Sequence, residues 1–203
     1  MERAITFRSG NTRLEGRLYR GAGENAAAIA HPHPQMGGDM ENPVVKLAAE
    51  AYRQAGWTTL RFNFRGVGRS EGAFDHGNGE QLDLQAAIGR LRVVGGRRLD
   101  VVGYSFGAWI AARWARSNPS HGQTIVLVAP PVDFLEFGTA SIPGLRHVII
   151  GEHDDFARVL HVERCLGGWQ PGAGMHIVSG ADHFFAGCGQ ALQAALAAAV
   201  RDR

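Results

Sequence analysis

The sequence predicts an α/β fold: a mostly parallel sheet of about eight strands, with an antiparallel hairpin at the N-terminus and helices on both faces. Apolar segments of strand length alternate with segments of helical spacing, which is typical of right-handed β-α-β units. The chain has 203 residues, of which 45% are hydrophobic and 20% charged. This composition is that of a globular chain, and the length suits a single domain over residues 1–203.

The first segments indicate a hairpin followed by a buried strand. Residues 3–8 and 12–20 alternate apolar and polar side chains around Ser9-Gly10-Asn11, a cluster of turn-forming residues. Two alternating segments joined by such a turn predict an antiparallel hairpin. Residues 26–30 are a continuous apolar run that stops at His31-Pro32, so we expect a buried strand that ends before the proline.

The first helix has recognisable signals at both ends. Asn42-Pro43 supplies an N-cap and a proline at the first helical position, and Gly56 supplies a C-terminal stop. The alternation then continues to the end of the chain. We expect further strands at 57–64, 99–102, 125–128, 148–150 and 175–178, and further helices at 79–93, 106–117, 156–166 and 188–201.

A serine stands where a strand is predicted to turn into a helix. Residues 103–107 read Gly-Tyr-Ser-Phe-Gly, directly after the strand at 99–102. A G-x-S-x-G pattern in this context exposes the serine hydroxyl on a sharp turn, where the glycines leave room that side chains would fill. Ser105 is therefore the candidate nucleophile. The alternative is a glycine-rich turn whose serine only caps the helix.

An acid and a histidine follow Ser105, each after its own predicted strand. Residues 151–155 read Gly-Glu-His-Asp-Asp, and Asp182-His183 comes after the last strand. Serine, acid and histidine in this chain order are expected of a Ser-His-Asp triad on such a sheet. Alone, Asp154 is a candidate helix cap and His183 an ordinary loop histidine, but three matches in order favour a shared site.

Together these motifs resemble the α/β-hydrolase superfamily over nearly the whole chain. The pieces that match are the R-G-x-G-x-S of residues 65–70, the elbow at Ser105, the G-x-x-D of residues 151–154 and Asp182-His183. The sequence is most similar to small, lidless bacterial hydrolases with an H-P-H-P-x-x-G-G loop, most of them described only as predicted serine hydrolases. The resemblance implies Ser105 as nucleophile, Asp154 as acid and His183 as base.

The G-x-x-D spacing of the family that the sequence resembles, counted from Gly151, implies Asp154 rather than its neighbour Asp155 as the acid. We expect Asp155 to cap the helix predicted at 156–166, where a carboxylate meets free N–H groups. The 65–70 stretch has a structural interpretation, in which Arg65 and the glycines shape a turn beside the elbow.

The oxyanion hole is expected to consist of backbone N–H groups. One donor is the N–H of Phe106, directly after the nucleophile. The other should come from the loop after the strand at 26–30, where the family's usual His-Gly is replaced by His31-Pro32. The prolines at 32 and 34 have no N–H. The remaining candidates are His33 and Gln35, which we favour equally, and Met36.

Charge and cysteine content limit the possible partners. There are 21 basic and 19 acidic residues, and the arginines are spread along the chain, so we expect no nucleic-acid partner. No apolar run approaches the roughly 18 residues of a membrane span. Two cysteines make no disulfide framework. We therefore expect a cytoplasmic protein without cofactor, metal or membrane partner that acts on a small-molecule acyl substrate.

Two other functions compete with a serine hydrolase. The first is a non-catalytic binding module on the same scaffold, because function depends on the site rather than on the fold. The second is a metal-dependent hydrolase that uses His31 and His33, which lie one residue apart at a strand end.

The connection between the strands at 125–128 and 148–150 is too short for a large cap, so we expect an open site. Phe134, Leu135 and Phe137 on this connection are candidates either for the rim of the site or for packing onto the sheet, and we slightly favour packing.

Overall fold

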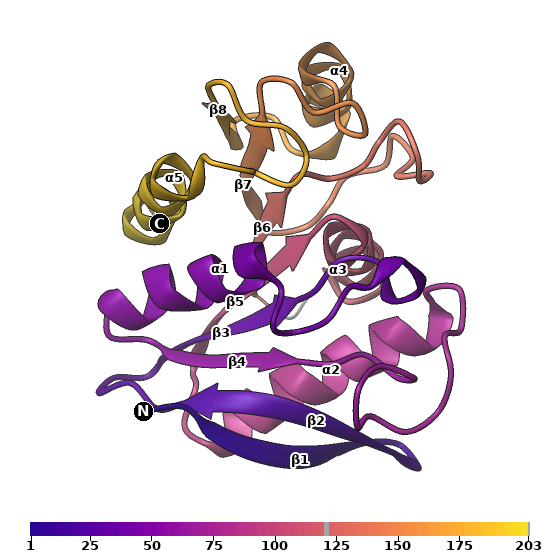
Figure 1. The fold of residues 1–203 in the computed structure, drawn as a ribbon, viewed down its shortest axis with the longest axis vertical. Coiled ribbons are helices and arrows are strands. Elements are labelled where there is room, and N and C mark those ends of the chain that lie inside the picture. The colour runs from indigo at the N-terminus through magenta and orange to yellow at the C-terminus, as the bar shows by residue number, and fades with distance from the viewer. Residues whose placement is uncertain (120–121, 203) are drawn as a thin grey trace.

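The computed structural model describes residues 1–119 and 122–202, which form an eight-stranded sheet flanked by helices (Figure 1). The strand order is β1-β2-β4-β3-β5-β6-β7-β8. β1 and β2 form the predicted antiparallel hairpin, β2 is also antiparallel to β4, and the other pairs are parallel. In chain order the elements are β1 Arg3–Ser9, β2 Thr12–Tyr19, β3 Asn25–Ala30, the 3-10 helix η1 Pro34–Met36, α1 Pro43–Gln54, β4 Thr58–Phe62, α2 Asn78–Val93, β5 Arg98–Tyr104, α3 Phe106–Ser117, β6 Thr124–Val128, β7 Leu145–Gly151, α4 Val159–Trp169, β8 Gly174–Val178 and α5 Gly189–Arg201.

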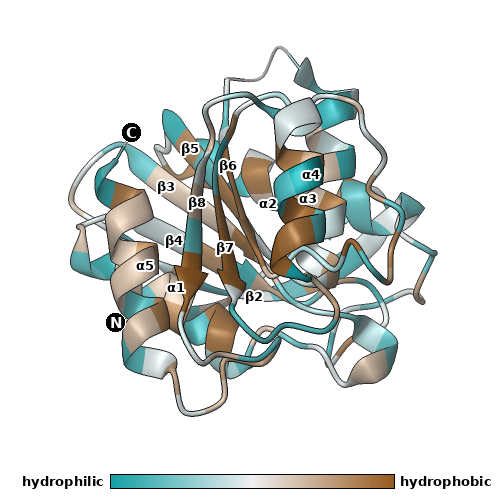
Figure 2. Cartoon of the chain, turned by 90° about the horizontal axis from the view of Figure 1, so that it is seen from above, coloured by the Kyte–Doolittle hydropathy of each residue, from teal (hydrophilic) through white to brown (hydrophobic). Residues whose placement is uncertain are grey.

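The helices cover both faces of the sheet, as predicted. Figure 2 shows α1 and α5 on one side and α2, α3 and α4 on the other. Each face therefore has its own apolar core. Tyr52, Val126 and Leu196 belong to the core under α1 and α5, while Ile110 and Trp169 belong to the opposite one. Burial of these side chains supplies most of the free energy that orders the sheet.

The parallel strands end along one edge of the sheet. Ala30 at the end of β3 pairs with Gly103 of β5, and Tyr104 pairs with Val128 of β6. The start of α3 is pressed against the end of β3, because a Cβ on Gly107 would lie 2.4 Å from the carbonyl oxygen of Ala30. Only glycine fits there. In such sheets ligands bind outside the carboxyl ends of the strands, so this edge positions the site.

The helix predicted at 156–166 is displaced along the chain, and α4 begins only at Val159. The reason is that the preceding N–H groups are used elsewhere. The N–H groups of Phe156 and Ala157 donate to Asp154 Oδ1, and that of Arg158 donates to Asp133 Oδ2. The chain therefore wraps around Asp154 before a helix can start. The expected cap at Asp155 is wrong: this residue is exposed, and Asp154 receives the N–H groups instead.

The connection between β6 and β7 forms no lid, as its length predicts. Phe137 is buried in the core on the α2, α3 and α4 face of the sheet, where its ring lies 5.2 Å from that of Trp169 at the end of α4. Phe134 is exposed instead. Within the described residues, no helix combines the length and the apolar character that crossing a membrane requires.

Arg65, just after β4, forms an ion pair with α2, a structural contact that the sequence does not predict. Its backbone N–H and Nε donate to Asp83 Oδ2, both at 3.0 Å, and its Nη2 donates to Oδ1 at 2.8 Å. Asp83 on α2 is fully buried. This bidentate ion pair joins the segment just after β4 to α2, on the sheet face that also carries α3.

We expect Asp83→Ala to lower the free energy of unfolding by about 2–4 kcal/mol, because it leaves the largely buried Arg65 charge without its partner. Urea unfolding at neutral pH measures the loss. The matched control is Glu24→Ala, which breaks an ion pair with Arg97 in which both side chains are exposed and should change stability little. Equal losses in the two variants would contradict a structural role for the Arg65–Asp83 pair.

Candidate active site

Ser105 occupies a strained turn between β5 and α3. Its backbone angles are φ 54° and ψ −116°, a conformation that residues with a side chain rarely adopt. The turn is held by its neighbours, since the Ser105 N–H donates to the Val128 carbonyl at 2.9 Å. A Cβ on Gly103 would lie 2.2 Å from the Gly107 carbonyl oxygen, so glycine is required. The Ser105 side chain makes no capping bond to α3, which excludes the interpretation as a simple cap.

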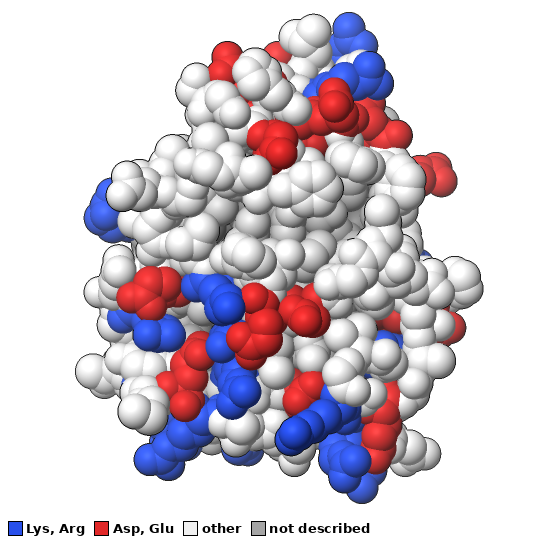
Figure 3. Space-filling model, in the orientation of Figure 1, with Lys and Arg blue, Asp and Glu red and all other residues white. Residues whose placement is uncertain are grey.

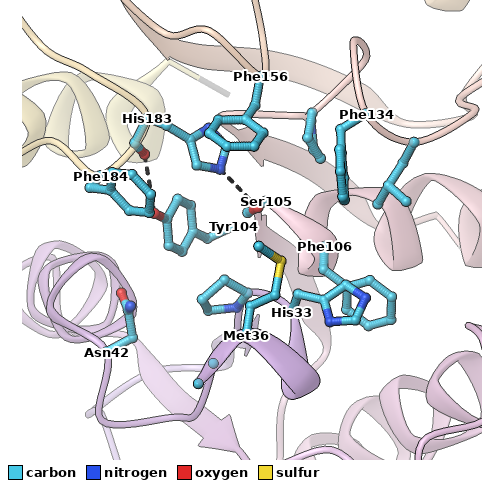
Figure 4. Close-up of a pocket in the computed structure, with 15 residues that line it drawn as sticks. His33, Met36, Asn42, Tyr104, Ser105, Phe106, Phe134, Phe156, His183 and Phe184 are labelled. Carbon is cyan, nitrogen blue, oxygen red and sulfur yellow. Dashed lines mark hydrogen bonds between the residues drawn. The ribbon is translucent and has the colours of Figure 1, made fainter.

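The three residues predicted to form a triad lie within hydrogen-bonding distance of one another. Ser105 Oγ is 2.9 Å from His183 Nε2, the contact drawn as a dashed line in Figure 4. His183 Nδ1 is 2.9 and 2.8 Å from the two Asp154 carboxylate oxygens. A carboxylate can only accept, so Nδ1 carries the ring proton and Nε2 is free to accept from the serine hydroxyl.

Both partners of the serine are buried and held by backbone groups. Asp154 and His183 are 2% and 6% exposed. Asp154 Oδ1 accepts the N–H groups of Phe156 and Ala157, each at 2.8 Å, which fixes the carboxylate opposite the imidazole. The Tyr104 hydroxyl donates to the His183 carbonyl at 3.1 Å. Burial, aided by nearby carboxylates, raises the pKa of Tyr104, so this phenol stays protonated and keeps donating.

The loops after β7 and β8 are locked to each other. Glu152 Oε2 accepts from Ser179 Oγ at 2.7 Å and from the Gly180 N–H at 2.8 Å. A Cβ on Gly151 would lie 2.4 Å from the Ala181 carbonyl oxygen. The glycine of the G-x-x-D motif is therefore required by the close approach of the two loops. This contact fixes the position of the Asp154 loop relative to the His183 loop.

His31 anchors the loop that follows β3. It is fully buried, its Nδ1 donates to the Pro32 carbonyl at 2.6 Å, and its Nε2 accepts from the Phe64 N–H at 3.0 Å. Burial lowers the pKa of His31 to about 4, so the ring is neutral at neutral pH. Because both ring nitrogens are used within the protein, His31 has no lone pair for a metal. This argues against the metal-dependent alternative based on His31 and His33.

The loop after β3 places the backbone N–H of His33 at the site, but not that of Gln35, the other favoured oxyanion donor. Among the described residues, the N–H groups of His33 and Phe106 have no protein acceptor, and both residues line the cavity beside Ser105 (Figure 4). Gln35 is exposed and its N–H donates to His33 Nδ1 at 3.2 Å. The Met36 N–H donates to the His33 carbonyl at 3.0 Å. The geometry thus favours His33 over Gln35 and Met36 as the second donor.

A cavity of about 230 Å³ opens directly onto Ser105. Phe134 and Leu135 line this cavity. Of the three residues on the β6–β7 connection for which the sequence slightly favours packing onto the sheet, these two therefore contribute to the site. Phe156 and Phe184 also line it, and neither was singled out from the sequence. The available signal was their position in the chain, since Phe156 lies two residues after Asp154 and Phe184 directly follows His183.

In residues 1–119 and 122–202, no group of three or more His, Cys, Asp or Glu side chains is arranged to hold a metal ion. The polar groups that converge at the cavity are instead those of acyl-transfer chemistry: a hydroxyl, an imidazole backed by a carboxylate, and two free N–H groups.

The chain belongs to the alpha/beta hydrolase fold family, whose family model matches residues 33–147. It is also 35% identical over 196 residues to the uncharacterized protein RP471 of Rickettsia prowazekii (strain Madrid E), with 89% of this chain and 81% of that protein covered.

Solved structures show the same relationship. An alpha-beta serine hydrolase homologue from Coxiella burnetii is 30% identical with a TM-score of 0.88, and the match covers 97% of this chain and 96% of that one. XC6422 from Xanthomonas campestris, a member of the a/b serine hydrolases without a lid, is 32% identical with a TM-score of 0.87, covering 98% and 94%. These relatives support a hydrolase function and the small, lidless bacterial type.

Replacing one or the other of the two adjacent aspartates with asparagine should affect activity differently. Asp154→Asn should keep the fold but lower kcat by about 10³–10⁴-fold, because the amide can donate to His183 and favour the wrong tautomer. Asp155→Asn is the matched control and should leave kcat nearly unchanged, since this side chain is exposed and faces solvent. Steady-state kinetics with a 4-nitrophenyl ester, together with both melting temperatures, measures the difference. Loss of activity only in Asp155→Asn would mean that the acid is assigned one residue too early.

His31 should make the fold sensitive to mild acid. Its pKa is about 4 in the folded chain but about 6.5 when unfolded, so its contribution is complete above pH 6.5 and is lost as the pH falls toward 4. We expect this residue to reduce the free energy of unfolding by about 2 kcal/mol between pH 7 and pH 5. Urea unfolding at the two pH values measures the loss. His31→Asn should show a correspondingly smaller loss, and an identical loss in both proteins would contradict the assignment.

Proposed function

We propose that this protein is a serine hydrolase that cleaves a carboxylic ester, a thioester or a related acyl bond of a small substrate through an acyl-enzyme intermediate. The observation that carries the proposal is the hydrogen-bonded series Ser105–His183–Asp154 on a strained turn at the floor of a cavity. A hydroxyl is a weak nucleophile, and an adjacent base is what activates it.

The first half of the reaction forms the acyl-enzyme. As Ser105 Oγ attacks the substrate carbonyl carbon, its proton passes to His183 Nε2, and the carbonyl oxygen gains a negative charge. The N–H groups of Phe106 and His33 are the proposed donors to this oxygen. When the tetrahedral intermediate collapses, the imidazolium gives its proton to the departing oxygen or sulfur, and the acyl group remains on Ser105.

The second half repeats these steps with water. His183 takes a proton from the water as its oxygen attacks the acyl carbon, and then returns a proton to Ser105 Oγ as the acid leaves. Asp154 stabilises the imidazolium in both halves and is not itself protonated. Donors already fixed by the fold need no reorganisation during the reaction, and removing one such donor typically costs about 10²–10³-fold in kcat.

The proposal is favoured over a non-catalytic binding module by the intact geometry of all three positions. A scaffold that only binds a ligand has no need for a buried carboxylate that orients a histidine, nor for the backbone strain at Ser105. We also propose that the protein acts in the cytoplasm without a cofactor, in keeping with its two free cysteines.

Reaction with a fluorophosphonate tests this proposal. The probe should form one P–O bond to Ser105 Oγ with release of fluoride, which mass spectrometry detects as one added phosphonyl group per chain. Ser105→Ala should abolish labelling, whereas the control Ser117→Ala, which removes an exposed hydroxyl at the C-terminal end of α3 that donates to the Arg113 carbonyl, should not. Folded protein that stays unlabelled, or that is labelled at another residue, would refute a serine hydrolase at this site.

A further inference from the structure

The walls of the Ser105 cavity are apolar. Besides Ser105, His33, His183 and Asn42, its lining consists of apolar or aromatic side chains and two glycines, and none of these described lining residues is Lys, Arg, Asp or Glu. The cavity volume of about 230 Å³ lies below the roughly 300–1,000 Å³ of sites for drug-sized ligands. The site therefore suits a compact ligand and offers no counter-charge to an ionised one.

The rim of the cavity is apolar as well as exposed. Met36, Phe134 and Phe184 are 66%, 58% and 63% exposed, and they belong to three separate segments: η1, the β6–β7 connection and the loop after β8. Figure 4 shows Phe134 and Phe184 on opposite sides of Ser105, with Met36 between them. These are three of the eight large hydrophobic side chains that the described chain exposes. Such a concentration at one opening marks a binding surface.

The surface beside the loop between β8 and α5 is largely uncharged. Figure 3 shows an uncharged band across the middle of the molecule, between groups of charged side chains above and below it. In the same orientation of Figure 1, the loop between β8 and α5 runs along this band. Aromatic contacts extend the apolar surface inward, because the Phe156 ring lies 5.9 Å from Phe134 and 4.8 Å from His183.

We infer that the substrate of this site is an ester or thioester with a compact, apolar and uncharged acyl group, which is selected by the rim residues Met36, Phe134 and Phe184. The inference rests on the proposed function and adds the substrate class to it. An apolar acyl group removes water from the exposed rings when it binds. A carboxylate in the same place would lose part of its hydration without gaining a partner, and this penalty disfavours it.

Two substrates of equal length test the inference. 4-Nitrophenyl hexanoate and mono-4-nitrophenyl adipate share the leaving group and the six-carbon chain but end in a methyl group and a carboxylate. We expect kcat/KM for the hexanoate to be higher by about tenfold or more. Equal values for the two esters would overturn the inference while leaving the serine hydrolase intact, because fluorophosphonate labelling of Ser105 does not depend on it. A rate jump above the substrate's critical micelle concentration would also overturn it, since the rim would then be a lipid-docking surface.

A charge placed on the rim should change the preference. Phe134→Lys supplies the missing counter-charge, so kcat/KM for the adipate relative to the hexanoate should rise about tenfold. Met36→Lys, from a different segment, should act in the same direction and guards against a folding defect in one variant. The matched control is Leu160→Lys on α4, which is 65% exposed but does not line the cavity and should leave the ratio unchanged. An unchanged ratio in both rim variants, or an equal rise in the control, would contradict the inference.

Discussion

The backbone of Ser105 is forced into a conformation that costs of order 1–3 kcal/mol, and packing of the surrounding strands maintains it. Gly103 and Gly107 allow β5, α3 and the end of β3 to approach more closely than any side chain permits. The same contact sets the position of the loop after β3, which supplies His33. Ser105 and its proposed oxyanion donors are thus placed by one packing arrangement, and a side chain at Gly103 or Gly107 would disturb all of them.

Buried polar groups hold the surrounding loops in place without a lid. His31 uses both ring nitrogens to fasten the loop after β3, and Asp154 uses one carboxylate oxygen to fasten the chain ahead of α4 while orienting His183. Each bond satisfies a group whose burial would otherwise be costly. The result is an open, apolar rim on a rigid base. The proposed selection of the substrate therefore depends on a few exposed side chains of this rim rather than on a closing domain.

The sequence predicts the local and periodic features well, because turns, caps and apolar runs depend on neighbouring residues. The hairpin, α1 from its Asn42-Pro43 start, and the serine–acid–histidine order all belong to this class. The start of α4 was misplaced because Asp133, distant in sequence, accepts the Arg158 N–H. The anchoring role of His31 is not predicted from the sequence, since its partner Phe64 is 33 residues away and comes close only when β3 and β4 are paired.

The proposed oxyanion hole consists of two backbone N–H groups, those of Phe106 and His33, which point at the oxygen that becomes negative when Ser105 attacks. A crystal structure of the enzyme phosphonylated by a fluorophosphonate tests it most directly, because the phosphonyl oxygen stands in for the oxyanion. We expect this oxygen to lie about 2.7–3.1 Å from the backbone nitrogens of both Phe106 and His33. An oxygen directed to solvent, or held by Gln35 or Met36 in a rearranged loop, would contradict it.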